Sequence, residues 1–185
     1  MVLTKTPICN FGEKTKSFEL KGIDGQLHKL EDHIGKNGLL IMFICNHCPY
    51  VKAIIRDIVE DCKNLRKKGV NSIAIMSNDT KEYPEDSFEN MKIFSKKFNF
   101  TFPYLIDETQ EIAKKYKAEC TPEFYLFNQQ NKLEYRGRMD ETSPSSDKKP
   151  SGKDLRVAID NLLSNQPVCE EQLPSMGCNI KWKAN

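Results

Sequence analysis

A continuous apolar run that leads into two closely spaced cysteines constrains the fold of this chain most strongly. Residues 39–44 read Leu-Leu-Ile-Met-Phe-Ile, a pattern typical of a strand in a parallel sheet that is covered on both faces. Beyond Pro49 the apolar residues recur about one helical turn apart, which predicts a helix over about residues 49–67. Cys45 and Cys48 therefore lie where the strand ends and the helix begins.

This position affects the chemistry of the two thiols. The unpaired N–H groups at a helix N-terminus carry partial positive charge, which favours a thiolate over a thiol. In Cys-x-x-Cys pairs of this kind the thiol pKa falls from about 8.5 to roughly 3.5–7.5. The spacing lets Cys45 and Cys48 form and break a disulfide without large backbone movement. The pattern therefore predicts a redox-active pair.

Size and charge exclude several classes of protein. A chain of 185 residues fits one domain, and we expect residues 1–185 to form it, with 164–185 as a C-terminal extension. The net charge of +2 gives no reason to expect nucleic acid or a membrane as a partner. No secretory signal or membrane span is recognisable, so we expect a soluble, cytoplasmic protein. In that compartment the seven cysteines are expected to be redox-active, metal-binding or buried rather than structural disulfides.

The rest of the chain predicts strands that alternate with helices. Strands are expected at 17–20 and 26–30, which form a hairpin, and at 70–77, 104–106, 123–128 and 133–138; helices are expected at 86–98, 109–116 and 154–163. Residues 142–152 predict a flexible loop, and the tail shows no periodicity. This order favours an α/β fold with a mainly parallel sheet and helices on both faces. A redox Cys-x-x-Cys at the end of the first βα unit is typical of a thioredoxin-like fold.

Short motifs along the chain resemble those of one family. They read Cys-Asn-His-Cys-Pro-Tyr-Val at 45–51, Ser-Asn-Asp at 77–79, Tyr-Pro-Glu-Asp-Ser at 83–87, Cys-Thr-Pro at 120–122, Tyr-Arg-Gly-Arg at 135–138 and Gly-Cys-Asn-Ile-Lys-Trp at 177–182. With the N-terminal hairpin, they are similar to a peroxiredoxin-like group of redoxins within the thioredoxin-like superfamily, related to alkyl hydroperoxide reductase/thiol-specific antioxidant proteins. The resemblance implies a central mixed sheet flanked by helices, with an N-terminal β-hairpin and a C-terminal tail.

The resemblance also implies a thiol-disulfide oxidoreductase and roles for named residues. Cys45 would be the exposed nucleophile, and Cys48 would resolve the mixed disulfide. Thr121-Pro122 matches the family's cis-proline position, where the preceding backbone is left free to pair with a substrate chain. Thr121 and Cys120 would then lie at the substrate. A disulfide-bearing protein or a small-molecule thiol substrate, an external thiol reductant and an antioxidant role are implied, and no cofactor is.

Two departures from the family patterns bear on the chemistry. His47, directly before Cys48, resembles the oxidising thioredoxin-fold proteins, in which an imidazolium stabilises a thiolate and makes the disulfide a stronger oxidant. A solvated histidine at the start of the helix is an equal alternative. The peroxiredoxin pattern Pro-x-x-x-Thr-x-x-Cys aligns its peroxidatic cysteine with Cys48, but its Thr and Pro positions hold Cys45 and Ile41. The peroxidase pattern is therefore incomplete.

The remaining cysteines leave alternatives open. Cys120 is either a third redox thiol or a small buried residue. For Cys178 we favour packing, with Trp182 as an anchor of the tail, over a place near the active site. Cys9 and Cys62 are expected to be inert.

Outside the cysteines, Arg136 and Arg138 raise the question of an anionic ligand. We favour the simpler interpretation, which places both side chains on a solvent-exposed strand.

Two further function classes compete with the oxidoreductase. Cys45 and Cys48, with Cys120, Cys178 or His47, could hold zinc or an iron–sulfur cluster. A structural zinc site has four ligands and usually a second close pair, whereas Cys120 and Cys178 are isolated in the sequence, so we assign no metal ligands. The other class is a thioredoxin-fold binding protein without turnover.

Overall fold

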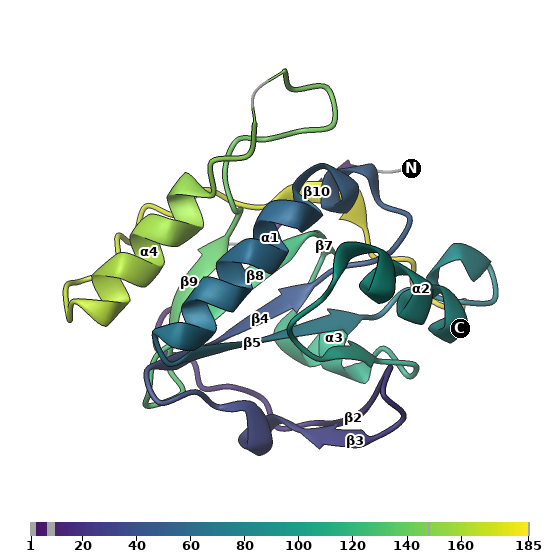
Figure 1. Cartoon of the computed structure of the whole chain (residues 1–185), viewed down its shortest axis with the longest axis horizontal. Helices are drawn as coiled ribbons and strands as arrows, with labels where there is room; N and C mark the ends of the chain where they lie inside the picture. The colour runs from purple at the N-terminus through teal and green to yellow at the C-terminus, as the bar shows by residue number, and fades with distance from the viewer. Residues whose placement is uncertain (1–2, 7–9, 148, 185) are drawn as a thin grey trace.

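A seven-stranded mixed sheet forms the centre of the molecule (Figure 1). The computed structural model describes residues 3–6, 10–147 and 149–184. In sheet order the strands are β3 (Leu27–Lys29), β2 (Glu19–Gly22), β6 (Tyr104–Ile106), β5 (Val70–Met76), β4 (Gly38–Phe43), β8 (Glu123–Phe127) and β9 (Leu133–Gly137). Only the β4–β5 and β5–β6 pairs are parallel. The predicted mixed sheet is confirmed, but the expectation that it is mainly parallel is wrong, because both hairpins add antiparallel strands.

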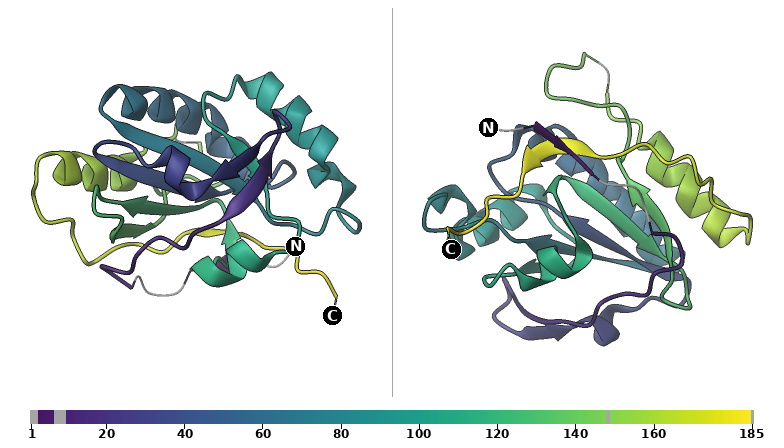
Figure 2. Two further views of the ribbon diagram at one scale, coloured as in Figure 1. Left: turned by 90° about the horizontal axis from the view of Figure 1, so that it is seen from below. Right: turned by 180° about the vertical axis from the view of Figure 1, so that it is seen from behind.

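Helices cover both faces of this sheet, as predicted (Figure 2). They are α1 (Pro49–Lys67), α2 (Phe88–Phe98), α3 (Glu111–Tyr116) and α4 (Lys153–Leu163). Helices α1, α2 and α4 pack on the face that carries Leu40 and Met42, and α3 packs on the face that carries Leu39 and Ile41. Every residue of β4 is buried, which explains why this strand is apolar throughout. None of the described helices is long and apolar enough to cross a membrane.

Helix α1 places the Cys-x-x-Cys because its own sequence defines both of its ends. Pro49 occupies the first turn, where its missing N–H costs no hydrogen bond. Val51, Ile54, Ile55 and Ile58 fall on one buried face. The helix ends before Gly69, whose φ of +78° suits glycine. The two cysteines are therefore fixed between a buried strand and a buried helix.

A second, three-stranded sheet was not predicted. It joins β1 (Leu3–Lys5), β10 (Met176–Asn179) and β7 (Cys120–Thr121) in the order β1-β10-β7, with both pairs antiparallel. Figure 2 shows the tail returning along the molecule so that β10 lies beside β1. The tail shows no periodicity in the sequence, and strand β10 was therefore not predicted. Its strand is held by pairing with segments far away in the sequence, which leave no local periodic signal.

Candidate active site

The two cysteines of the Cys-x-x-Cys lie at the junction of β4 and α1, with Cys48 as the N-cap of the helix. Cys45 is 1% exposed and Cys48 is fully buried. The expectation that Cys45 is exposed is therefore wrong. Side chains from two distant segments cover the site. The ring of Tyr83 stacks on the ring of His47, with 5.7 Å between the ring centroids, and Lys181 of the tail lies over the Tyr83 ring.

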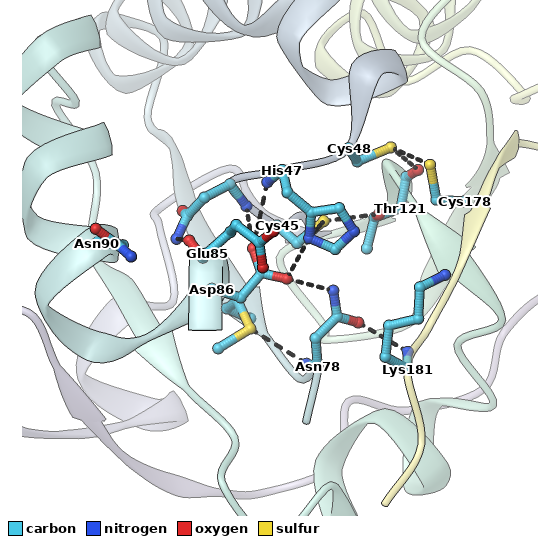
Figure 3. Close-up of polar contacts among 12 residues, drawn as sticks. Cys45, His47, Cys48, Asn78, Glu85, Asp86, Asn90, Thr121, Cys178 and Lys181 are labelled. Carbon is cyan, nitrogen blue, oxygen red and sulfur yellow. Dashed lines mark hydrogen bonds and ion pairs between the residues drawn. The ribbon is translucent and has the colours of Figure 1, made fainter. Parts of the chain in front are cut away.

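Cys45 faces Thr121 and His47 (Figure 3). Its Sγ lies 3.4 Å from Thr121 Oγ1 and 3.9 Å from His47 Nδ1. Burial raises the pKa of the Cys45 thiol, and its hydrogen bond with Cys48 and the nearby Asp86 carboxyl raise it further. Cys45 is therefore a protonated thiol in the reduced protein.

Cys48 makes a different set of contacts. Its Sγ lies 2.8 Å from Cys178 Sγ and 3.2 Å from the Thr121 carbonyl oxygen. The hydrogen bond with Cys178 lowers the pKa of Cys48 below its usual range, and hydrogen bonds with Cys45 and the Val51 N–H act in the same direction. The same bond raises the pKa of Cys178. A thiolate at this site is therefore placed best on Cys48.

His47 is paired rather than simply solvated. Its Nδ1 lies 2.6 Å from Oδ2 of Asp86, a residue of the short 3-10 helix η2 (Pro84–Asp86). Hydrogen bonding to Asp86 raises the pKa of His47. The Asp86 carboxylate also accepts hydrogen bonds from the backbone N–H groups of Asn46 and His47 and from Nδ2 of Asn78. These bonds compensate its complete burial.

Asn78 connects this carboxylate to the tail. Its Nδ2 donates to Asp86 and its Oδ1 accepts from the Lys181 N–H at 2.9 Å. Asn78 and Asp86 were not predicted as site residues, although both lie in motifs that carried the family resemblance. A positional signal was present for Asn78: it follows β5, the parallel neighbour of β4, so it and Cys45 lie at the same edge of the sheet.

Thr121 contacts both cysteines, and the Thr121-Pro122 peptide bond is cis, as the resemblance implied. The Thr121 backbone, however, is not free. It pairs with Cys178 of β10, so the tail occupies the edge that was expected to accept a substrate chain. Gly177 makes this approach feasible, because a Cβ at this position would overlap the Thr121 carbonyl group.

The other cysteines separate clearly. Cys120 is fully buried, and burial raises its pKa. Its Sγ is 4.0 Å from the Pro122 carbonyl oxygen. Cys178 rather than Cys120 contacts the pair, so the prediction that Cys178 only packs in the tail is wrong. Cys62 is buried in α1, where burial raises its pKa to about 12, consistent with an inert thiol. Cys9 lies outside the described residues.

Arg136 is buried, so its predicted place on an exposed strand is wrong. Its guanidinium forms a 2.7 Å ion pair with the buried Glu123 of the neighbouring strand β8. Arg138 pairs with Asp154 at 2.7 Å, and both of these side chains are partly exposed.

Three potential metal ligands come together, but not the set considered from the sequence. Ligand atoms of Cys45, His47 and Asp86 all lie within 4.8 Å of one another. His47 Nδ1 and Asp86 Oδ2 are 2.6 Å apart. Two zinc ligands with bonds of about 2.0–2.1 Å in a tetrahedral arrangement would be separated by roughly 3.3 Å. The arrangement is therefore that of a hydrogen-bonded His–Asp pair.

Comparisons with known proteins agree with this architecture. The chain is similar to the crystal structure of an uncharacterized conserved protein from Geobacillus kaustophilus, with 44% identity over 100% of this chain and 98% of that one and a TM-score of 0.97. It also resembles a thiol:disulfide interchange protein of the thioredoxin family from Chlorobium tepidum TLS, at 14% identity over 82% of this chain and 97% of that one, with a TM-score of 0.64. These likenesses confirm the predicted thioredoxin-like fold.

The sequence matches extend to named proteins. Thiol-disulfide oxidoreductase ResA from Geobacillus thermodenitrificans (strain NG80-2) is 25% identical over 122 residues, which are 66% of this chain and 66% of that protein, slightly under two thirds of its length. The sequence model of the AhpC/TSA family matches residues 11–136. This match covers well over half of the chain, so the chain belongs to the AhpC/TSA family.

Proposed function

We propose that this chain is a thiol-disulfide oxidoreductase that works by reversible formation of a disulfide between Cys45 and Cys48. The single observation that carries the proposal is the geometry of this pair at the start of α1, where the sulfurs of both cysteines contact Thr121. Hydrogen bonds there lower the pKa of Cys48, whereas burial raises the pKa of Cys45. The thiolate is the reactive form of a cysteine. The name of the relative ResA supports the same activity.

Cys45 is the sulfur that bonds the substrate, and Cys48 is the sulfur that resolves. In the reducing direction, Cys45 passes its proton to the hydrogen-bonded Cys48 thiolate and attacks a substrate disulfide. The substrate sulfur that leaves takes up this proton, so Cys48 is a thiolate again. The Cys48 thiolate then attacks Cys45 Sγ, which releases the second substrate sulfur and forms the Cys45–Cys48 disulfide. In the oxidising direction the substrate thiolate attacks Cys45 Sγ, and Cys48 is the better leaving group because its pKa is lower.

His47 supports the less acidic thiol. When protonated, it brings a positive charge to within 3.9 Å of Cys45 Sγ, and its pairing with Asp86 favours that protonated form. The imidazolium therefore stabilises a thiolate as it develops on Cys45. It acts together with the Cys48 contacts to favour the reduced pair, which makes the disulfide a stronger oxidant.

The substrate is a disulfide-bearing protein or a small-molecule disulfide or thiol, and an external thiol resets the pair. Because β10 occupies the edge at Thr121, we place the approach of the substrate on the side of His47, whose side chain is 17% exposed. An antioxidant role would proceed by disulfide exchange, because Cys45 stands where the peroxidase pattern has threonine.

A redox titration of the full chain in glutathione buffers, read by alkylation and peptide mass spectrometry, tests this function. We expect Cys45 and Cys48 to interconvert as one reversible disulfide, and Cys45→Ser to abolish turnover of a model disulfide. Cys169→Ser is the matched control, because Cys169 is exposed and outside the site. Thiols that stay unpaired at every potential, or that react only after a chelator is added, would contradict the proposal.

A further inference from the structure

The tail places a third thiol within the site. Cys178 lies opposite Thr121 in the β10–β7 pair, and Thr121 contacts Cys45 through its hydroxyl and Cys48 through its carbonyl group. The Sγ atoms of Cys178 and Cys48 face each other at 2.8 Å (Figure 3). A disulfide bond is about 2.05 Å long, so these two sulfurs are within about 1 Å of the bonded distance.

We propose that Cys178 is a third redox thiol and that Cys48 exchanges its disulfide partner between Cys45 and Cys178. This inference rests on the proposed function, because it starts from the Cys45–Cys48 disulfide. The hydrogen bond with Cys48 is the largest cause of the raised pKa of Cys178, and it is lost while Cys48 is bonded to Cys45. Cys178 then gives up its proton and attacks Cys48 Sγ in line with the existing bond. The Cys48–Cys178 bond forms as the Cys48–Cys45 bond breaks, and Cys45 leaves with the bonding electron pair.

The exchange is balanced without an outside oxidant or reductant. One disulfide and one thiol are present before and after it, and the proton that Cys178 loses is taken up by Cys45. An external thiol, which the proposed function already requires, then reduces the Cys48–Cys178 disulfide. After the exchange Cys45 is a thiol again, and the disulfide lies between Cys48 and Cys178.

The tail is held so that Cys178 stays in reach of Cys48. On one side β10 pairs with β1, and on the other with β7. Beyond Cys178, the Lys181 backbone N–H donates to Asn78, and the Lys181 carbonyl oxygen accepts from the Asp79 N–H and from the Gln110 side chain. These bonds fix the segment on the C-terminal side of Cys178, and the strand pairing fixes Cys178 itself.

Cys178 lies on the strand edge at which a substrate chain was expected. The strand edge at Thr121 is where the family resemblance led us to expect a bound substrate chain, and this chain fills it with its own tail. Cys178 therefore presents a sulfur from the edge where a bound peptide would lie, but it presents it to Cys48 rather than to Cys45 and from within the same molecule.

Mapping of disulfides in the oxidised full chain tests the inference. The protein is oxidised in steps with glutathione disulfide, quenched in acid, alkylated and digested, and cross-linked peptides are identified by mass spectrometry. We expect both a Cys45–Cys48 and a Cys48–Cys178 species in the wild-type protein. In Cys45→Ser we expect a reversible Cys48–Cys178 disulfide, and this species should be lost in Cys178→Ser but kept in Cys169→Ser.

The outcomes separate the two proposals. If the wild-type protein forms the Cys45–Cys48 disulfide and no Cys48–Cys178 species appears, even in Cys45→Ser, the exchange is refuted and the oxidoreductase stands. If neither disulfide forms at any ratio of glutathione disulfide to glutathione, both proposals fail. Because the wild-type measurement needs no variant, poor folding of a variant leaves the test intact.

Discussion

The imidazole of His47 and the carboxylate of Asp86 form a 2.6 Å contact in which Asp86 is fully buried and His47 is the partner nearer to the surface. His47 of this pair lies beside Cys45, so a change in the protonation of the pair changes the electrostatic environment of the Cys45 sulfur. The hydrogen bond to Asp86 raises the pKa of His47 above its ordinary value, so the imidazolium beside Cys45 persists to higher pH.

Replacing Asp86 with Asn should lower the pKa of His47. The hydrogen bond to Asp86 is the largest cause of the raised pKa of His47, and the variant also removes the negative charge of Asp86. Titration of the histidine ring resonances by NMR measures the change. Asp24→Asn is the control, because Asp24 contacts His28 at 3.0 Å and leaves His47 untouched. An unchanged His47 titration in Asp86→Asn would show that the pair does not set this pKa.

The same pair predicts a pH dependence of stability. The pKa of His47 in the folded state is raised above 6.5, so its contribution is complete below that pH and is lost as the pH rises through the raised value. We expect the free energy of unfolding of the wild type to exceed that of His47→Gln by on the order of 1–2 kcal/mol at low pH, and by less at high pH. Urea unfolding at several pH values measures this difference, and a difference that grows with pH would contradict the assignment.

Removal of the Cys178 sulfur should raise the pKa of Cys48. Its hydrogen bond with Cys178 is the largest cause of the lowered value. In Cys178→Ala, the thiolate absorbance in the ultraviolet should therefore appear at higher pH than in the wild type. Cys120→Ala is a matched control, because Cys120 is buried nearby without bonding to the pair. Equal shifts in both variants would point to general loosening of the site.

Local patterns predicted the part of the site that is continuous in the sequence. The apolar run of β4 and the helical spacing after Pro49 predict the positions of Cys45 and Cys48 in the fold. A strand buried on both faces and a helix with a period of 3.6 residues each give a recognisable sequence pattern. Pairing between distant segments gives no such pattern in the sequence. Strand β10 has only four residues, and Cys178 is 130 positions away from Cys48. Its place in the site could therefore not be derived from periodicity.

The charged residues show the same limit. Arg136 was expected to be exposed because arginine in an alternating strand usually faces water. Its counterion, Glu123, lies on the adjacent strand β8, and both side chains are buried together. The register sets Arg136 opposite Tyr125, and Glu123 is the next residue of β8 on the same face. The sequence of β9 alone does not reveal this diagonal pair.

The buried Glu123–Arg136 pair leads to a stability prediction. Arg136→Met leaves the Glu123 carboxyl buried without its counterion, which should cost about 3–5 kcal/mol of the free energy of unfolding. The double variant with Glu123→Gln should recover part of that loss. Arg138→Met is the control, and its loss should be smaller because Arg138 and Asp154 are partly exposed. Chemical denaturation measures all three, and similar losses for Arg136→Met and Arg138→Met would contradict the prediction.

Gly177→Ala tests whether the close approach of the tail sets the chemistry of the site. The added Cβ would overlap the Thr121 carbonyl group, so β10 has to move away from β7. We expect a loss of about 1–3 kcal/mol in the free energy of unfolding, as for other overpacked positions. As β10 moves, Cys178 withdraws from Cys48, so the pKa of Cys48 should rise as it does in Cys178→Ala. Met176→Ala changes an exposed side chain of the same strand and should leave this pKa unchanged. A Gly177→Ala protein that is destabilised but keeps the wild-type thiolate titration would show that the tail supports the fold without tuning Cys48.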